Sequence, residues 1–224
     1  MEWQLALRLV AVAAFAYLIG GVPWSLIIGC RFYGIDVRTE GSGNLGATNV
    51  LRVLGAKAGA VTLALDIAKG AAAVGFAVFA VPAAGFGGMA HQWAMIIATM
   101  AAIMGHSYSP YIGFKGGKGV ATACGAVLVL TPTALAILLP VWLVVIVVTR
   151  TVSLGSVVVA LAYTPLCLWL YPGDWLIVGF AAIAAMLVIW RHRANIVRIV
   201  RGTEPRVSFK DRGSQTRNKA GRDG

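Results

Sequence analysis

Residues 119–149, GVATACGAVLVLTPTALAILLPVWLVVIVVT, decide how this chain folds, because they form an apolar run without a charged residue. A transmembrane helix needs about 20 apolar residues, so this run is too long for one ordinary crossing. The triplet Thr131-Pro-Thr133 interrupts it, and a proline between polar residues is typical of a turn between helices. We therefore expect two short helices that meet at 131–133.

The composition places the chain among integral membrane proteins. Hydrophobic residues make up 59% of its 224 positions, charged residues make up 12%, and the mean hydropathy is +0.81. A soluble domain carries about 25% charged residues, so a soluble globular class is excluded. Other apolar segments reach or approach the length of a crossing at 3–29, 55–81, 90–106, 157–171 and 175–190. Together with the divided run, they predict seven transmembrane helices.

The distribution of basic residues supports seven helices and predicts how the chain is oriented in the membrane. If the N-terminus lies outside, the inner segments are 30–54, 107–118, 150–156 and the tail after 190. These segments hold most of the Lys and Arg residues. The outer turns near 82–89, 131–133 and 172–174 contain no Lys or Arg. Arg8, in the first apolar segment, is the one Lys or Arg residue on the predicted outer side. A single crossing over 119–149 would place Arg150 outside, so the positive-inside rule favours two helices there.

The end of the chain is strongly basic. Ten of its 19 Lys and Arg residues lie from Arg191 onward, which is typical of a cytoplasmic segment beside anionic lipid and not of a nucleic-acid site. We expect one transmembrane domain over 1–204 and a basic, disordered cytoplasmic tail over 205–224. The predicted fold class is all-α, a polytopic membrane protein with its N-terminus outside and its C-terminus in the cytoplasm. Its cysteines lack metal-ligand spacing, and no metal site is expected.

Two glycine-rich polar segments lie on the predicted inner side. The first is GSGNLGATNVLR at 41–52, and the second is GFKGGKG at 113–119. Glycines let main-chain N–H groups approach an anion closely, and the Ser, Asn, Thr and Arg side chains add donors. Lys115 and Lys118 flank two glycines before a predicted helix, where free N–H groups and positive charge favour a phosphate. The alternative for this second segment is a flexible inner loop with lysines that only follow the positive-inside rule.

Both segments resemble nucleotide-binding patterns without fulfilling them. Residues 41–46 match G-x-G-x-x-G, and Asp66 follows 20 residues later. That fingerprint requires a preceding strand and a βαβ unit, whereas apolar helices flank this segment. Residues 113–119 end in Lys118-Gly119, the reverse of the Gly-Lys order of a P-loop. We therefore expect neither a dinucleotide site nor a P-loop.

Other inner segments add candidate ligands. His106 could serve as a base, a phosphate ligand or a helix cap. Ser153 and Ser156 could cap the helix that follows them, or they could bind an anion together with a neighbouring arginine. His192 and Asn195 are three residues apart on a predicted helix and share a face, although an interfacial basic anchor is the alternative for that segment.

Asp66 and Lys69 are charged residues inside an apolar segment, at positions i and i+3. A buried ion is costly unless it is paired, so we expect them to pair with each other. The alternative is that Lys69 contacts the ligand.

Taken together, these segments are similar to the motifs of one family. They are GSGNLGATNVLR at 41–52, GH at 105–106 with FKGGKGVAT at 114–122, RTVSLGS at 150–156 and RHRANI at 191–196. From residue 15 to Glu204 the chain resembles the bacterial acyl-phosphate-dependent glycerol-3-phosphate acyltransferases. The resemblance implies transfer of a fatty acyl group from acyl phosphate to the 1-hydroxyl of sn-glycerol 3-phosphate, the first step of phospholipid synthesis. The products would be 1-acyl-sn-glycerol 3-phosphate (lysophosphatidic acid) and phosphate.

The resemblance also implies a location and the roles of residues. It implies a seven-helix protein of the bacterial inner membrane, with its active-site loops facing the cytoplasm. The implied catalytic residues are Ser42, Asn44, Thr48, Lys118 and His192. The implied substrate-binding residues are Gly43, Asn49, Arg52, His106, Lys115, Gly116, Gly117, Ser153, Ser156 and Asn195. Which of Lys115 and Lys118, and which of Ser153 and Ser156, makes the direct contact stays open.

The expected chemistry fits these residues. The His-x-x-x-x-Asp pair of acyltransferases that use thioester donors is absent, because Ile96, Tyr111 and Val197 stand five residues after the three histidines. An acyl phosphate is a mixed anhydride with a good leaving group, so positioned donors can replace a strong base. We hypothesise that a phosphate oxygen of the substrate or His192 accepts the hydroxyl proton.

The alternative function is a membrane transporter of a phosphorylated solute. Such a protein would place binding residues near the midplane and gates on both sides, whereas the loop donors of this chain fall on one predicted side. The expected partners are glycerol 3-phosphate, fatty acyl phosphate, membrane lipid and a soluble phosphate acyltransferase that makes acyl phosphate. No cofactor and no nucleic acid are expected.

Overall fold

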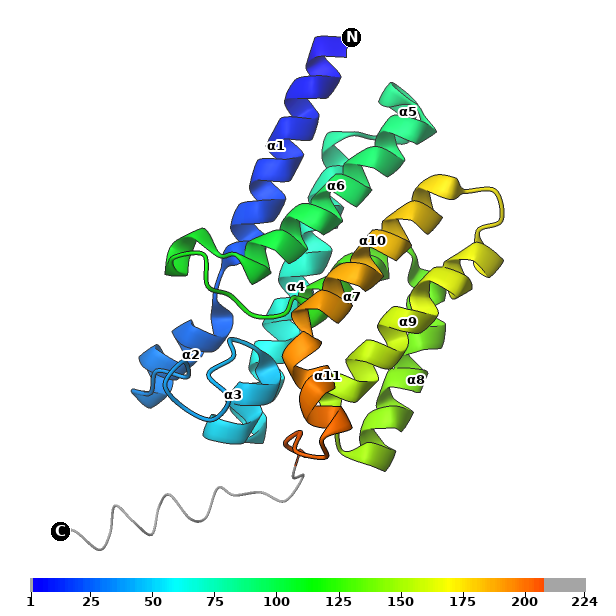
Figure 1. Ribbon diagram of the computed structural model, residues 1–224. Coiled ribbons are helices and arrows are strands. Elements are labelled where there is room, and N and C mark those ends of the chain that lie inside the picture. Colours follow the sequence, from blue (N-terminus) through cyan, green and yellow to red (C-terminus); the bar gives the residue numbers. More distant parts are fainter. Residues whose placement is uncertain (1, 208–224) are drawn as a thin grey trace, which may run out of the picture.

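The computed structural model describes residues 2–207, and every regular element in that range is a helix (Figure 1). The all-α prediction is therefore confirmed. In chain order the elements are α1 (Glu2–Gly21), α2 (Trp24–Tyr33), α3 (Ala47–Leu54), α4 (Ala56–Ala80), α5 (Ala83–Phe86), α6 (Gly88–Ser107), the 3-10 turn η1 (Pro110–Ile112), α7 (Val120–Leu130), α8 (Pro132–Thr149), α9 (Val152–Leu170), α10 (Trp175–Arg191) and α11 (Arg193–Val200).

The apolar run at 119–149 divides as predicted, into α7 and α8. Pro132 is the first residue of α8, where its missing N–H leaves no hydrogen bond unmade. Thr131, which joins the two helices, is fully buried and its hydroxyl lies 2.8 Å from the hydroxyl of Tyr163 on α9. Thr131 is therefore packed inside the bundle, whereas Pro132 and Thr133, which follow it in the predicted turn, are exposed.

The first apolar segment, predicted as one helix over 3–29, is broken. Pro23 has no N–H to donate and interrupts the hydrogen-bond pattern of the helix, so α1 ends at Gly21 and α2 begins at Trp24. The carbonyl groups freed by the break accept from side chains remote in sequence: Ser109 Oγ, just before η1, donates to Gly21 O at 2.6 Å, and Lys69 Nζ of α4 donates to Val22 O at 2.9 Å. Such compensation is needed wherever a helix is interrupted in an apolar environment.

Helix length and composition identify several membrane-type helices. Among the described residues, four stretches are long and apolar enough to span a bilayer, and α10 with α11 makes a fifth if its 61° bend is included. Because α7 has 11 residues, it is about 16 Å long, roughly half the thickness of a hydrocarbon core. The fold is thus that of a multi-pass membrane protein, while the count of seven crossings stays a prediction.

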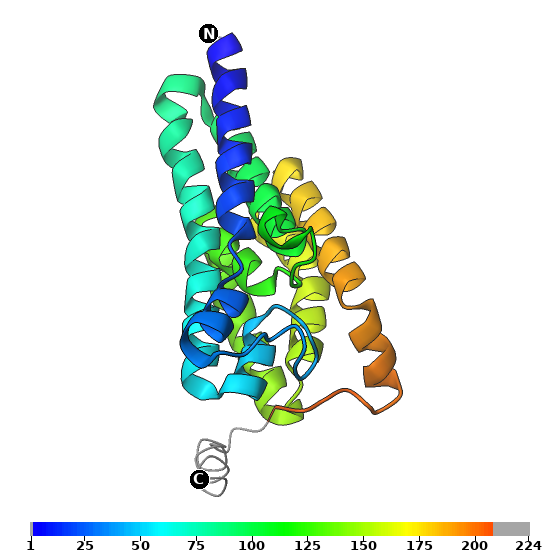
Figure 2. The same ribbon diagram turned by 90° about the vertical axis from the view of Figure 1, so that its left-hand side faces the viewer.

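The long helices of the bundle lie side by side (Figure 2), and glycines let several of them pack closely. A Cβ on Gly70 of α4 would lie 2.0 Å from the carbonyl oxygen of Thr122 on α7, and one on Gly125 would lie 1.8 Å from that of Ile67. The same holds between α1 and α6, where a Cβ on Gly105 would lie 2.1 Å from Tyr17 O. Close backbone approach of this kind is a common basis of helix association in membranes.

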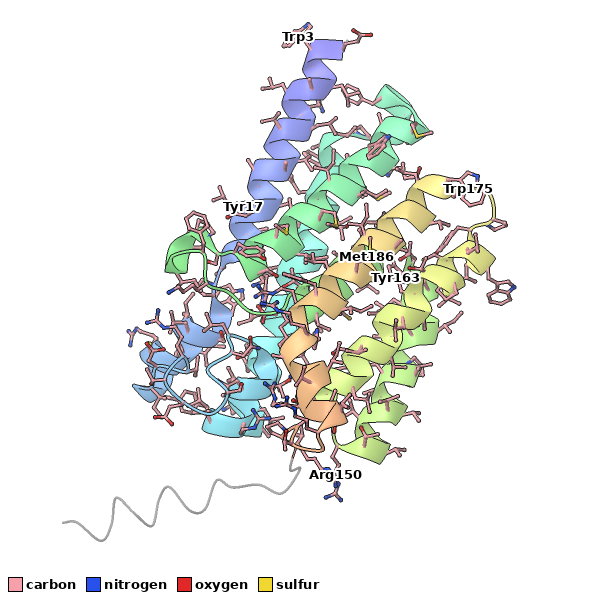
Figure 3. All side chains as sticks on the ribbon, viewed as in Figure 1. Trp3, Tyr17, Arg150, Tyr163, Trp175 and Met186 are labelled. Atoms are coloured by element: carbon pink, nitrogen blue, oxygen red, sulfur yellow. The ribbon has the colours of Figure 1, made fainter. Side chains whose placement is uncertain are left out.

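The two ends of the bundle differ in chemistry. Trp3 and Trp175 lie near one end, and Arg150 lies at the other (Figure 3). Helices α2, α3 and α11 gather at the Arg150 end in both ribbon views (Figures 1 and 2). Val207 is buried there and its N–H donates to Arg150 O at 2.8 Å, so the first residues of the predicted tail pack against the α8–α9 turn. The remainder of that tail, 208–224, lies outside the described residues.

Candidate functional site

The first glycine-rich loop is built around the side chain of Asn49. This side chain, 1% exposed, accepts from Ser42 N and Ser42 Oγ at 2.8 and 3.1 Å and donates to Val37 O and Glu40 O at 2.9 and 3.1 Å. Gly41 has a φ of +61°, and a Cβ there would lie 2.5 Å from Asn49 Oδ1, so the loop closes this tightly only with glycine. Asn49, predicted to bind substrate, has its hydrogen-bonding capacity engaged in holding the loop.

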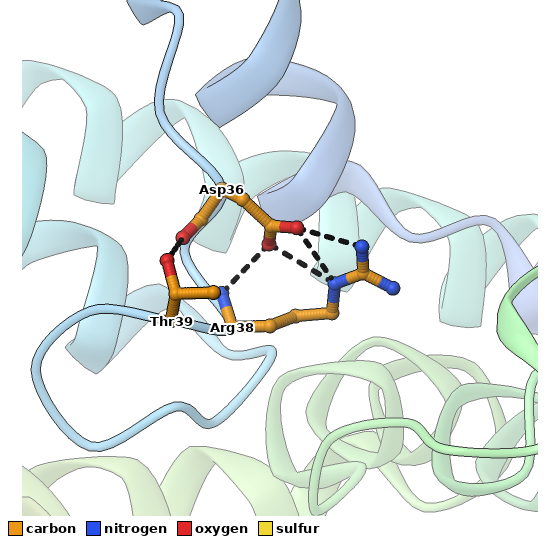
Figure 4. A network of polar contacts seen from close by, with 3 residues as sticks. All are labelled: Asp36, Arg38 and Thr39. Atoms are coloured by element: carbon orange, nitrogen blue, oxygen red, sulfur yellow. Dashed lines mark hydrogen bonds and ion pairs between the residues drawn. The ribbon is translucent and has the colours of Figure 1, made fainter.

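The turn that enters this loop is fixed by Asp36 (Figure 4). Its carboxylate accepts from Arg38 Nε at 3.0 Å, Arg38 Nη2 at 2.6 Å and Arg38 N at 2.9 Å, while Thr39 Oγ1 donates to Asp36 O at 2.9 Å. Asp36 is one of the two carboxylates, with Glu40, that lie between α2 and the loop. Because Arg38 neutralises it, this carboxylate shapes the turn and is unsuited to act as a base.

Asn44, Thr48 and Arg52 are the candidate residues of the first loop that keep their donors available. Within residues 2–207, their side chains make no hydrogen bond to another residue, whereas the hydroxyl of Ser42 is bonded to Asn49. Thr48 and Arg52 stand on α3, which begins directly after the loop. The loop therefore presents donors at α3 and uses its own polar groups to hold its shape.

The second glycine-rich segment packs against the end of α6. The N–H groups of Gly116 and Gly117 donate to Ser107 O and His106 O, both at 3.1 Å. A Cβ on Gly116 would lie 2.0 Å from His106 O, and one on Gly117 would lie 2.3 Å from His106 Nε2. These glycines are thus required for contact with α6. Their N–H groups, predicted to face a phosphate, are already bonded.

A buried charged cluster lies beneath this segment. Lys69 Nζ and Asp66 Oδ1 are 2.8 Å apart, so the predicted pairing of these two residues is confirmed. His106 is also buried, and its Nδ1 lies 3.2 Å from Thr122 Oγ1 and 3.7 Å from Asp66 Oδ1. The structure therefore places His106, predicted as a substrate ligand, under the glycine pair as part of its support.

Lys118 connects the second segment with the end of the chain. Its ammonium donates to Asn195 Oδ1 at 2.5 Å. Burial lowers the pKa of Lys118 to about 8; Glu204 acts to raise this pKa, and the cations of Arg198, Arg191 and Arg52 lower it further. Charges from several separate segments therefore converge on this ammonium. Lys115, the other lysine of the segment, is exposed and lies outside the cluster.

Glu204 is the centre of the polar cluster around Lys118. Its Oε1 accepts from Ser153 Oγ and from Asn195 Nδ2, both at 2.6 Å, and its Oε2 accepts from Arg198 Nε at 2.7 Å. Burial acts to raise the pKa of Glu204, but these hydrogen bonds outweigh it, and the pKa lies below its ordinary value. The donors thus form a site for an anionic group, which Glu204 itself occupies here.

Part of this cluster is predictable from the sequence. Lys118, Ser153 and Asn195 were predicted to act together, and the structure brings them together. Glu204 and Arg198 were missed. A usable signal existed, because Glu204 is the sole acidic residue between Asp174 and Asp211, in a stretch rich in arginine. A lone carboxylate among many cations is expected to form specific hydrogen bonds.

The two candidate serines occupy different positions. The predicted inner segment 150–156 is largely helical, because α9 begins at Val152. Ser153 is the serine that reaches Glu204. Ser156 instead donates to Val152 O at 3.0 Å and accepts from Trp142 Nε1 at 3.4 Å. The structure therefore favours Ser153 as the serine of the anion site.

His192 stands at the break between α10 and α11. It is 2% exposed, and its Nδ1 lies 2.8 Å from Val188 O. A carbonyl oxygen can only accept, so the hydrogen-bond network assigns the proton to Nδ1 and leaves Nε2 as an acceptor. This tautomer suits a group that receives a proton or a hydroxyl hydrogen bond.

Apolar helices that hold a cluster of cationic and polar side chains toward one end are the arrangement of a multi-pass membrane protein with a candidate site for an acidic ligand. A family model described as glycerol-3-phosphate acyltransferase matches residues 10–202. A glycerol-3-phosphate acyltransferase of Listeria monocytogenes serovar 1/2a is 42% identical over 205 residues, which cover 92% of this chain and 100% of the relative. One from Thermosynechococcus vestitus is 42% identical and covers 88% and 93%. The chain belongs to the glycerol-3-phosphate acyltransferase family.

Solved structures agree with this assignment. Crystal structures of PlsY (YgiH), an integral membrane glycerol 3-phosphate acyltransferase, exist in a glycerol 3-phosphate form and a lysophosphatidic acid form. They superpose on this chain with TM-scores of 0.78 and 0.76, respectively, and both are 35% identical to it. Each superposition covers 89% of this chain, and the two cover 96% and 95% of the PlsY chain. This chain is accordingly an integral membrane acyltransferase.

Proposed function

We propose that this chain transfers a fatty acyl group from acyl phosphate to the 1-hydroxyl of sn-glycerol 3-phosphate. The observation that carries the proposal is the anion site, where Ser153, Asn195 and Arg198 donate to a carboxylate and Lys118 donates to the same Asn195, a set of donors that equally suits a phosphate. The glycerol 3-phosphate and lysophosphatidic acid forms of PlsY support this acceptor and this product. The one-sided placement of donors does not favour a transporter.

The reaction needs two anions to be held close together. The 1-hydroxyl oxygen attacks the acyl carbonyl carbon, an ester C–O bond forms, and the C–O bond to phosphate breaks with its electron pair leaving on phosphate. The hydroxyl proton passes to a phosphate oxygen of the substrate or to Nε2 of His192, whose assigned tautomer leaves that nitrogen free to accept it. Fixed cations lower the cost of bringing the two phosphates together.

The two phosphates are assigned to neighbouring groups of donors. The phosphate of glycerol 3-phosphate is assigned to Lys118, Ser153 and Asn195, together with His192. Acyl phosphate is assigned to the other donors of the first loop that remain available, Asn44 and Thr48. Arg52 of α3 joins the glycerol 3-phosphate group, because its charge is among those that lower the pKa of Lys118.

We further propose one transmembrane domain over 1–204, with seven crossings and the site on the cytoplasmic side of the bacterial inner membrane. The break at Thr131 divides 120–149 into α7 and α8, and two helices between Lys118 and Arg150 support a common side for these residues. The exposed Cys30 on α2 provides a test. A membrane-impermeant maleimide is expected to label it in inverted vesicles and not in right-side-out vesicles, and the reverse result contradicts this orientation.

The substrate assignment is tested with purified protein and labelled glycerol 3-phosphate. Acyl phosphate or acyl-CoA is offered as the donor, and product is separated as lysophosphatidic acid. We expect product from acyl phosphate. Product from acyl-CoA alone contradicts the donor assignment. Adding a soluble phosphate acyltransferase that makes acyl phosphate is expected to sustain the reaction in a coupled assay.

A further inference from the structure

Arg191, the last residue of α10, is bonded to the backbone of the second glycine-rich segment. Its Nη2 donates to Gly117 O at 2.5 Å and reaches Gly116 O at 3.3 Å. The guanidinium lies over the ring of Tyr108, 5.2 Å from its centroid. Tyr108 is itself held, because the hydroxyl of Tyr17 donates to its carbonyl oxygen at 2.7 Å. Arg191 is thus fixed by a stacked ring on one side and by two carbonyl groups on the other.

The glycine pair is held from two directions. Its N–H groups donate to Ser107 O and His106 O, and its carbonyl oxygens accept from Arg191. A glycine pair has no side chains of its own to fix its path, so these backbone bonds determine its conformation. Lys118 follows directly, and its ammonium reaches Asn195. The segment therefore meets the α10–α11 region twice, once through Arg191 and once through Lys118.

We propose that Arg191 is a positioning residue for the acyl transfer: it holds the carbonyl groups of Gly116 and Gly117, and thereby places the ammonium of Lys118 at the substrate phosphate. The proposal rests on the proposed function only in assigning Lys118 to that phosphate. An arginine suits the task because its planar group can donate to two carbonyls while stacking on a ring, which a lysine cannot do.

The charge of Arg191 gives this role a measurable signature. Lys118 is surrounded by Arg52 of α3, Arg191 of α10, Arg198 of α11 and Glu204, and His192 lies nearby at the break after α10. Arg191 is one of the cations that lower the pKa of Lys118. Replacing it with a neutral residue removes one repulsion and releases the segment. Both changes raise the pKa of Lys118.

The test compares Arg191→Gln and Arg191→Lys with Arg193→Gln, at saturating acyl donor and over a range of pH. Arg193 is a matched control, because it is an exposed arginine stacked on Trp190 at 4.5 Å and bonded to Trp190 O. For Arg191→Gln we expect kcat/KM for glycerol 3-phosphate to fall about tenfold or more, with the alkaline limb of its pH profile moved to higher pH. Arg191→Lys should recover part of the loss, and Arg193→Gln should match the wild type.

Several results would overturn the proposal. The first is an unchanged kcat/KM in Arg191→Gln. The second is a lower yield of folded Arg191→Gln protein whose kinetics per folded enzyme are normal, because that result indicates a purely structural role. If Arg191→Gln does not fold, Arg191→Lys decides: wild-type kcat/KM in that variant contradicts the need for a planar donor. The wild-type enzyme is assayed first, so a failure of the proposed function appears as inactivity from acyl phosphate before any Arg191 variant is compared.

Discussion

The ammonium of Lys118 and the side-chain oxygen of Asn195 are 2.5 Å apart, although 77 residues separate them in the sequence. Asn195 in turn donates to Glu204, so one amide links a cation from the second glycine-rich segment to a carboxylate near the end of the described chain. The amide accepts through its oxygen and donates through its nitrogen. This arrangement requires an asparagine, since an aspartate at this position could not donate to Glu204.

Lys118→Ala is expected to lower kcat/KM for glycerol 3-phosphate about 100-fold, as the loss of a partly buried cation that contacts a substrate phosphate commonly does. Lys57→Ala is the matched control, because Lys57 is an exposed lysine on α4. Steady-state kinetics with varied glycerol 3-phosphate provide the measurement. Equal activity of the two variants would remove Lys118 from the phosphate site.

The rate should also depend on pH through the same ammonium. Because burial lowers the pKa of Lys118 to about 8, the cation is present below that pH and is lost as the pH rises through it. We expect kcat/KM to fall on the alkaline side of about pH 8. The fall in kcat should come at higher pH, since a bound phosphate stabilises the ammonium. In Lys118→Arg the alkaline fall should disappear from kcat/KM; a persistent fall near pH 8 assigns it to another group.

The sequence predicts the helical bundle better than it predicts the site. The division of 119–149 follows from length and one proline, both of which are local properties. The break at Pro23 was missed, since its cost is offset by Lys69 and Ser109, which are remote in sequence. Glycine spacing indicated a phosphate cradle, yet Gly116 and Gly117 are required by packing against His106. Such long-range compensation leaves no local pattern to read.

Glu204→Gln should destabilise the protein by about 2 kcal/mol, the usual scale for hydrogen bonds to a charged group. The pKa of Glu204 lies below its ordinary value of 4.5, so its stabilising contribution is present above that value and is lost as the pH falls through the lower, folded-state pKa. Thermal unfolding in detergent at pH 7 and at low pH provides the measurement. The difference in melting temperature between wild type and variant should become smaller at low pH. A gap independent of pH would show that the carboxylate charge contributes nothing.

Asn49→Asp should be nearly as damaging as Asn49→Ala. The aspartate keeps an oxygen for Ser42 but loses the two donations to Val37 O and Glu40 O, and it places a negative charge against those carbonyl groups. Activity and limited proteolysis of the first loop report the effect. If Asn49→Asp retains wild-type activity and protection, the donating half of the amide is not what holds the loop.

Gly117→Ala tests whether the glycines of the second segment serve packing. An added Cβ would lie 2.3 Å from His106 Nε2 and 2.5 Å from Leu45 O, so the segment must shift away from α6 and carry Lys118 with it. We expect a lower melting temperature and a loss of kcat/KM of about tenfold or more. Gly75→Ala is the matched control, because a Cβ there meets nothing within 4 Å. Since alanine favours a helix over glycine by up to about 1 kcal/mol, that variant should be as stable as the wild type or more so. Equal melting temperatures and equal activities in both variants would mean that the contact with α6 tolerates a side chain, and the glycine pair would then have to be explained by the ligand after all.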